Sequence, residues 1–131
     1  MTLEEARTFF DKDYFATGLC GIHIDSLEPD GAVLSMPITT MHLNGNGVVQ
    51  GGAIYTLADT AFAVAANAYG TSMVNRSADI TYLKPGKGSV LYAKASCIAR
   101  GAKMGLYRVE ILDENQTLIA YMAANGFTIT P

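Results

Sequence analysis

The sequence has 131 residues, of which 50% are hydrophobic and only 16% are charged. Intrinsic disorder requires low hydrophobicity and high net charge, so this composition excludes it, and the length predicts one domain over residues 1–131. The net charge of −3 has the wrong sign for a nucleic-acid-binding protein. Two cysteines and two histidines lack the spacing of a disulfide framework or a zinc site, so we expect no metal catalysis.

The most apolar stretch covers residues 53–68 and contains Asp59. A bilayer span requires about 20 apolar residues, and a central aspartate adds about 2.5–3.5 kcal/mol to the cost of insertion. The N-terminal residues also lack the basic start and apolar core of a signal peptide. We therefore expect no membrane association and a cytoplasmic location.

The first predicted element is a short helix over residues 2–13, where Thr2 can cap the N-terminus. Two strands are predicted next, at 19–27 and 32–38, joined by a turn that contains Pro, Asp and Gly. Residues 39–50 contain Asn-Gly-Asn-Gly, which is typical of irregular structure.

The clearest element is a helix over residues 51–69, followed by Gly70 as a C-terminal cap residue. It is apolar on nearly every side, which predicts a buried helix that the rest of the chain wraps. Four strands are predicted after it, at 72–84, 89–100, 104–113 and 117–130. Because each linker is short enough for a hairpin, we expect consecutive strands to be antiparallel neighbours. The predicted class is α+β, a central helix wrapped by a five- to six-stranded antiparallel sheet.

Asp59 is the only charged residue between Gly31 and Asn75. An unpaired buried carboxylate is costly, so its presence needs a reason. One interpretation is structural: a helix face that reaches water, or a pair with Arg76 or Arg100. The other is a catalytic carboxylate in a cleft.

The start of the long helix reads Gln50-Gly51-Gly52, which leaves backbone N–H groups without intrahelical acceptors. Together with the helix dipole, such groups can bind an oxyanion. Gly52 and Asp59 lie seven residues apart, about 10 Å along the axis. A nucleophile must approach within about 3–3.5 Å of the carbon that it attacks. One helix therefore cannot polarise a carbonyl at its tip and attack it with its own Asp59, whereas two antiparallel copies can. This spacing predicts an active site shared across a homodimer.

The segment from His42 to Asp59, HLNGNGVVQGGAIYTLAD, resembles the signature of the hotdog-fold acyl-CoA thioesterases of the PaaI-like branch. That signature is H-x-N-x-x-G-x-x-H-G-G, followed by L-x-D within the helix. The later Tyr82-Leu-Lys-Pro segment and the Arg100-Gly101 pair also fit. The resemblance implies a hotdog fold and hydrolysis of an acyl-CoA thioester to free acid and coenzyme A, with no cofactor beyond the coenzyme A of the substrate.

The resemblance also implies roles for residues of the signature. Asp59 is the nucleophile or the general base, and Gly51, with Gly52 behind it, presents the N–H that polarises the thioester oxygen. Asn44 orients the water or the thioester. A polar residue near the start of the next strand faces the site in many members, which favours Asn75, with Ser77 as the alternative on the same strand face.

Gln50 stands where the family usually has a histidine. A glutamine can donate a hydrogen bond to a carbonyl, but it cannot carry a titrating proton. This departure keeps open a second hypothesis, a non-catalytic module that binds acyl-CoA or another small ligand. A hydratase is less favoured, because no histidine stands at the helix start.

The basic residues near the predicted turn at 100–103 suggest how coenzyme A binds. Arg76, Arg100 and Lys103 are expected at one end of the sheet, where they can meet phosphates. The resemblance implies coenzyme contacts from Arg100, Gly101 and Lys103, and it adds Tyr82 to the substrate-binding residues.

Two further expectations concern the substrate and the assembly. The small residues Ala61, Ala65 and Ala66 leave room for an aryl or medium-chain acyl group. The surplus of apolar residues favours a homodimer, and we expect two dimers to pair into a tetramer.

Overall fold

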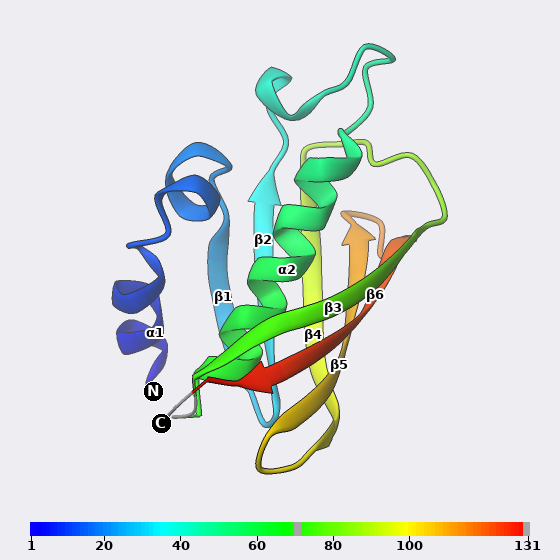
Figure 1. Ribbon diagram of the computed structural model, residues 1–131. Coiled ribbons are helices and arrows are strands. Elements are labelled where there is room, and N and C mark those ends of the chain that lie inside the picture. The colour runs from blue at the N-terminus through cyan, green and yellow to red at the C-terminus, as the bar shows by residue number, and fades with distance from the viewer. Residues whose placement is uncertain (70–71, 130–131) are drawn as a thin grey trace.

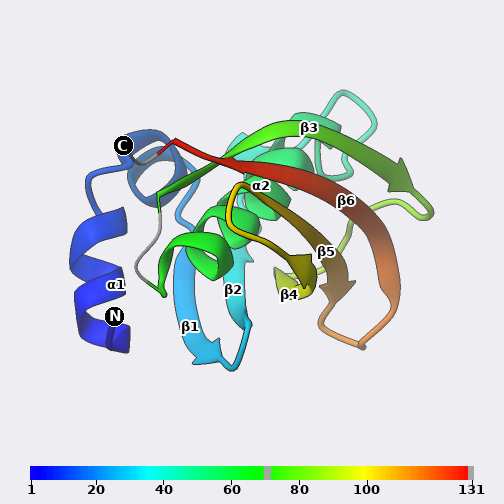
Figure 2. The same cartoon turned by 60° about the horizontal axis from the view of Figure 1, so that its bottom comes forward.

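Helix α2 (Gly51–Asn67) lies against a six-stranded antiparallel sheet that curves around it, as Figures 1 and 2 show. The structure is a computed structural model that describes residues 1–69 and 72–129. The strands follow the order β1-β2-β4-β5-β6-β3. Their bounds are β1 His23–Glu28, β2 Gly31–Pro37, β3 Met73–Tyr82, β4 Val90–Arg100, β5 Met104–Asp113 and β6 Leu118–Thr128. The predicted long helix is confirmed over 51–67, and Gly70 lies outside the described residues.

The buried helix expected from the sequence is also confirmed. Its buried residues are Ile54, Leu57, Ala58, Thr60, Ala61, Phe62, Val64, Ala65 and Ala66. Alternate residues of the strands, such as Leu34, Leu91 and Met122, are fully buried and belong to the same core. Within the described chain, no helix has both the length and the hydropathy needed to cross a membrane.

The expectation that all four later strands are consecutive neighbours is wrong for the first pair. Strand β3 pairs with β6, and β4 pairs with β2. In Figure 1, β3 passes in front of α2, whereas β4 lies behind it. A helix that is apolar all round needs cover on more than one side, so the linker crosses from one side to the other. The backbone N–H of Val49, which precedes the helix, bonds to the carbonyl of Gly86 in that linker at 3.0 Å.

The hairpins β4–β5 and β5–β6 form as predicted. The start of β3 and the turn at 100–103 do lie at the same end of the sheet, because Met73 pairs with Thr128 and the Thr128 N–H donates to the Lys103 carbonyl at 2.8 Å. The prediction of a common end is therefore confirmed even though β3 and β4 are not neighbours, because the two strands still run in opposite directions.

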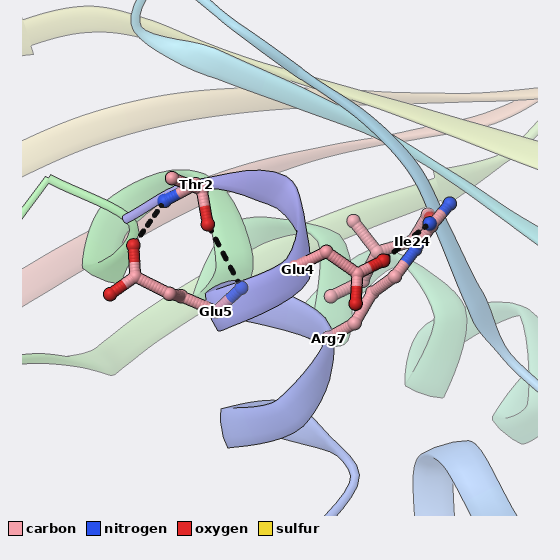
Figure 3. Close-up of polar contacts among 5 residues, drawn as sticks. All are labelled: Thr2, Glu4, Glu5, Arg7 and Ile24. Atoms are coloured by element: carbon pink, nitrogen blue, oxygen red, sulfur yellow. Dashed lines mark hydrogen bonds and ion pairs between the residues drawn. The ribbon is translucent and has the colours of Figure 1, made fainter.

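Helix α1 (Leu3–Phe10) is shorter than the predicted 2–13. Thr2 and Glu5 form reciprocal hydrogen bonds, the capping box drawn in Figure 3. Arg7 Nε donates to the Ile24 carbonyl at 3.0 Å, which ties the helix to β1. An exposed ion pair of 3.7 Å joins Glu4 to Arg7.

The strand predicted to begin at residue 19 begins only at His23. Before it lies a π-helical turn, η1 (Tyr14–Leu19). Asp13 caps this turn by accepting from the Ala16 N–H at 3.1 Å. Gly21, with φ of +71°, then turns the chain toward β1 in a conformation that other residues rarely adopt.

Candidate active site

The first turn of α2 presents two free backbone donors. Gln50 is the N-cap residue, and its Oε1 accepts from the Ala53 N–H at 3.1 Å. The N–H groups of Gly51 and Gly52 have no acceptor in residues 1–69 and 72–129. Unsatisfied N–H groups at the positive end of a helix dipole favour a developing negative charge. The oxyanion site expected from the sequence is therefore available.

The side chain of Gln50 folds back over Gly52. A Cβ atom at Gly52 would lie 2.6 Å from Gln50 Oε1, so this arrangement needs glycine. Because Oε1 is held by the Ala53 N–H, the Nε2 group remains as a donor at the helix tip, and no acceptor for it occurs in the described part of the chain. Gln50 can therefore donate to a carbonyl oxygen placed at the tip.

Asp59 is half-buried and is held by Asn75, whose Nδ2 donates to Asp59 Oδ1 at 3.0 Å. The predicted proximity of these residues is confirmed. The hypothesis of a structural ion pair is wrong: Asp59 has no ion pair in the described residues. The Arg76 guanidinium lies 5.4 Å from the Phe127 ring, and Arg100 bonds to other groups.

The preference for Asn75 holds, but the expectation that Ser77 lies on the same strand face is wrong. A β-bulge lies between them, so Asn75 pairs with Gly126 while Ser77 pairs with Asn125. Because successive residues of β6 point to opposite faces of the sheet, the bulge turns Ser77 to the exposed face. Only Asn75 reaches the carboxylate. Its Oδ1 is buried and has no donor within the described residues.

The carboxylate and the helix tip share one face of α2 but lie two turns apart. Beyond the first turn, the less buried positions of α2 follow one stripe, which also includes Gly52: Tyr55, Thr56, Asp59, Ala63 and Asn67. The distance of about 10 Å along the axis is too long for both groups to meet one carbonyl within one chain.

Asn44 shapes the loop before the helix. Its Oδ1 accepts from the N–H groups of Asn46 at 2.9 Å and Val48 at 3.3 Å. Its backbone N–H bonds to the Val48 carbonyl at 2.8 Å. The structure therefore gives Asn44 a structural role, and it does not bring Asn44 into contact with Asp59.

Tyr82, predicted to bind substrate, contacts the helix start. Its hydroxyl donates to the Gly51 carbonyl at 3.0 Å, which joins the end of β3 to the first turn of α2. Burial, together with the nearby Tyr55, raises the pKa of Tyr82, so the hydroxyl stays protonated and remains a donor.

The turn at 100–103 lies at the far end of α2. Arg100 Nη1 donates to the Ala66 carbonyl at 2.9 Å and to the Tyr107 hydroxyl at 2.6 Å. Gly51 and Ala66 are about 22 Å apart along the axis at 1.5 Å per residue. Gly101 donates its N–H to the Met104 carbonyl at 2.8 Å, and the Lys103 side chain is exposed.

The space for the acyl group differs from the expectation. Ala61, Ala65 and Ala66 are fully buried in the core. Instead, a pocket of about 500 Å³ lies beside the helix tip, lined in part by Phe15 and Met41. The sequence analysis missed these residues. The available signal was a group of large apolar side chains in segments too irregular to bury them.

Comparisons with known proteins agree with this architecture. A family model described as the thioesterase superfamily matches residues 46–120, more than half of the chain. The chain belongs to this superfamily. The acyl-coenzyme A thioesterase PaaI of Escherichia coli is 36% identical over 127 residues, which cover 96% of this chain and 90% of that protein.

Solved structures support the hotdog fold of this thioesterase superfamily member. The E. coli PaaI protein from the phenylacetic acid degradation operon superposes with a TM-score of 0.86 at 30% identity, covering 98% of this chain and 97% of that one. A hypothetical thioesterase from Streptococcus pneumoniae, solved with coenzyme A, has a TM-score of 0.82 at 24% identity and covers 91% and 95% of the two chains. The resemblance to PaaI-like thioesterases and the predicted fold are confirmed.

Proposed function

We propose that this protein hydrolyses acyl-CoA thioesters to a free acid and coenzyme A. The observation that carries the proposal is Asp59, held by Asn75 on the same open face of α2 as the free helix-tip donors. The 36% identity to an acyl-coenzyme A thioesterase supports the substrate class. Gln50 is compatible with this reaction because its Nε2 can act as a donor at the tip.

In the proposed reaction, the thioester oxygen accepts hydrogen bonds from the helix-tip N–H groups of Gly51 and Gly52. Asp59 either attacks the carbonyl carbon or takes a proton from the attacking water. Asn75 occupies Oδ1, which leaves Oδ2 for this step. The C–S bond then breaks, and the coenzyme A sulfur leaves as a thiolate that takes up a proton. In the general-base route, the attacking water supplies the hydroxyl of the acid. In the nucleophilic route, breaking the C–S bond leaves the acyl group on Asp59 as a mixed anhydride, which a water hydrolyses to the carboxylic acid and free Asp59. On either route, one water is consumed and one carboxylic acid forms.

The site is proposed to be shared between two subunits. A tip and a carboxylate about 10 Å apart in one chain can meet only if the tip lies beside the partner subunit's Asp59. Strand β3 supports a dimer, because it ends the sheet and pairs on one side only, with β6. A ten-residue unpaired edge favours association with another chain. The pairing of two dimers and the cytoplasmic location remain predictions.

The proposed path of coenzyme A leads from the tip toward the partner's turn at 100–103. In an antiparallel pair of helices, the partner's residue 66 lies about 10 Å beyond the partner's residue 59. Arg100 already bonds to Ala66 and Tyr107, so its substitution also disturbs the fold. Lys103 is the better probe, because its side chain is exposed. Lys103→Ala is expected to raise KM for acyl-CoA while leaving kcat and the KM of a short thioester without the nucleotide unchanged.

A thiol-release assay with a panel of acyl-CoAs tests the reaction. We expect turnover by the wild type and a loss of at least about 10²-fold in Asp59→Asn, which keeps the hydrogen bond from Asn75 possible but removes the base. The thermal stability of Asp59→Asn should hold or rise, because a half-buried charge is removed. Tight binding of acyl-CoA without turnover by the wild type would instead support the non-catalytic module.

A further inference from the structure

An open apolar pocket lies directly beside the helix tip. Its volume of about 500 Å³ falls within the usual range for small-molecule sites. One wall comes from η1 and the residue after it, with Phe15, Leu19 and Cys20; a second wall includes Met41 of η2 (Thr40–His42). The third side includes Gln50 and Gly52, so the pocket opens where the thioester oxygen is expected.

The π-helical form of η1 creates the first wall. The Cys20 N–H donates to the Phe15 carbonyl at 2.9 Å, five residues back. This wider turn places residues four and five apart on one side, so Phe15, Leu19 and Cys20 all face the pocket. Phe15 and Leu19 are 58% and 64% exposed, although both are large and apolar. Side chains of this kind at a concave surface are typical of a ligand site.

His42 braces the two walls. Its Nδ1 accepts from the Thr39 N–H at 3.0 Å, so Nε2 carries the proton and donates to the Cys20 carbonyl at 2.8 Å. The ring is buried and connects η2 to the end of η1. This buried contact therefore fixes how far η2 lies from the end of η1 at the pocket.

We propose that this pocket binds the acyl group, that it selects uncharged apolar acyl chains or rings, and that Phe15, Leu19 and Met41 set the accepted length. The inference rests on the proposed function for the position of the thioester. No Asp, Glu, Lys or Arg lines the pocket, and both ring nitrogens of His42, which also lines it, are held in hydrogen bonds within the fold. An acyl group with a second carboxylate would lose water without gaining a cationic partner, so such groups are rejected.

Binding of non-hydrolysable acyl-CoA thioethers tests the inference without turnover. In calorimetric titrations of the wild type, each added methylene should tighten Kd about fourfold, equivalent to about 0.8 kcal/mol, until the pocket is full. A succinyl analogue should bind at least about tenfold more weakly than a butyryl analogue. Phe15→Ala and Met41→Ala should each reduce the gain per methylene, and Leu19→Trp should end it at a shorter chain.

Tyr14→Ala is the matched control, because Tyr14 belongs to the same π-helical turn, is 75% exposed and does not line the pocket. It should leave the dependence on chain length unchanged. Phe15 and Met41 lie on different elements, so a folding defect in one variant leaves the other as a test. The inference would be overturned if the Kd of the wild type did not depend on acyl-chain length. It would also be overturned if Tyr14→Ala and Phe15→Ala changed the gain per methylene equally. Chain-length-dependent binding without thiol release would instead overturn hydrolysis and retain the pocket.

Discussion

The two ends of α2 are built in opposite ways. At the C-terminal end, polar side chains satisfy the last carbonyls: Asn67 Nδ2 donates to Ala63 at 2.8 Å, and Arg100 donates to Ala66 at 2.9 Å. At the N-terminal end, Gln50 satisfies one N–H, while those of Gly51 and Gly52 have no acceptor in the described chain.

We call the C-terminal end, where side chains bond to the helix carbonyls, the closed end, and the N-terminal end, with two N–H groups that have no acceptor in the described chain, the open end. The closed end joins the helix to β3, because Asn67 also exchanges hydrogen bonds with the Met73 backbone at 3.0 and 2.7 Å. The open end lies beside a pocket and carries the positive end of the helix dipole. Changes at the open end should therefore lower kcat and leave the free energy of unfolding unchanged. Changes at the closed end should lower the free energy of unfolding and leave kcat unchanged.

The largest expected effect comes from Gly51→Pro, which removes one helix-tip N–H. Proline is tolerated at the first helical position, and the backbone of Gln50 (φ −64°, ψ 136°) suits a residue that precedes proline. We expect kcat to fall by about 10²-fold or more, as for other oxyanion donors. Gly51→Ala is the control, because a Cβ there would meet the Tyr82 ring at an ordinary 3.4 Å and the N–H is kept. Equal losses in both variants would contradict the role of the N–H.

The same variant tests the shared site. Gly51→Pro and Asp59→Asn homodimers should both be inactive, but a mixed dimer contains one site with an intact tip and an intact carboxylate. Refolding the two proteins together should restore up to about a quarter of the wild-type sites if subunits pair randomly. Sedimentation must show dimers in the mixture. An active monomer of 13.9 kDa, or mixed dimers without recovery, would exclude a shared site.

At the closed end, Asn67→Ala should lower the free energy of unfolding by about 2 kcal/mol. The substitution leaves the buried backbone of Met73 without partners, which costs about 1–3 kcal/mol. Urea unfolding at a fixed protomer concentration measures this loss. The kcat of the folded variant should remain within about twofold of the wild type. A loss of kcat with unchanged stability would show that the two ends are not separate in function.

Gln50→Glu separates the two roles of the N-cap side chain. A carboxylate oxygen can still accept from the Ala53 N–H, and negative charge is favourable at this end of the helix, so the melting temperature should hold. The variant lacks the Nε2 donor, and we expect kcat/KM to fall at least about tenfold. Unchanged activity would mean that the amide donates nothing to the thioester.

The smallest expected effect concerns stability at alkaline pH. Burial raises the pKa of the Cys20 thiol, with a smaller contribution from Asp13. Burial also raises the pKa of Tyr107, partly offset by the hydrogen bond from Arg100. Each group therefore stabilises the fold fully below the pH at which it ionises in the unfolded chain, near 8.5–9 for a thiol and near 10 for a phenol. Above that pH the stabilisation is lost.

Chemical unfolding between pH 8 and pH 10.5 measures this loss. Tyr107→Phe should be less stable than the wild type at pH 8, because it loses the bond to Arg100, but its stability should fall less steeply above pH 10. Cys20→Ala should flatten the decline that begins near pH 9. Parallel slopes for the wild type and both variants would contradict these assignments.

The sequence was sufficient where the signal is local. An apolar 17-residue helix predicts its own burial, and a lone aspartate within it identifies the position that needs a partner. Asn75 was expected near the site from the resemblance to the PaaI-like thioesterases, not from a local pattern, and its Nδ2 does donate to Asp59. The prediction of a shared site also follows from helix geometry, since a rise of 1.5 Å per residue fixes the distance between Gly52 and Asp59.

Tertiary structure decided which strands are neighbours and which faces their side chains take. A linker such as 84–88 has a length that suits both a hairpin and a crossover, and only the need to cover α2 on two sides selects the crossover. The bulge that turns Ser77 away from Asp59 arises from pairing with β6, and no residue pattern within β3 predicts it. The apolar pocket likewise depends on His42 and Cys20, which are far apart in sequence and meet only after folding. Local patterns therefore determined the elements and the candidate reactive residue, whereas contacts between distant segments determined the topology and the shape of the candidate site.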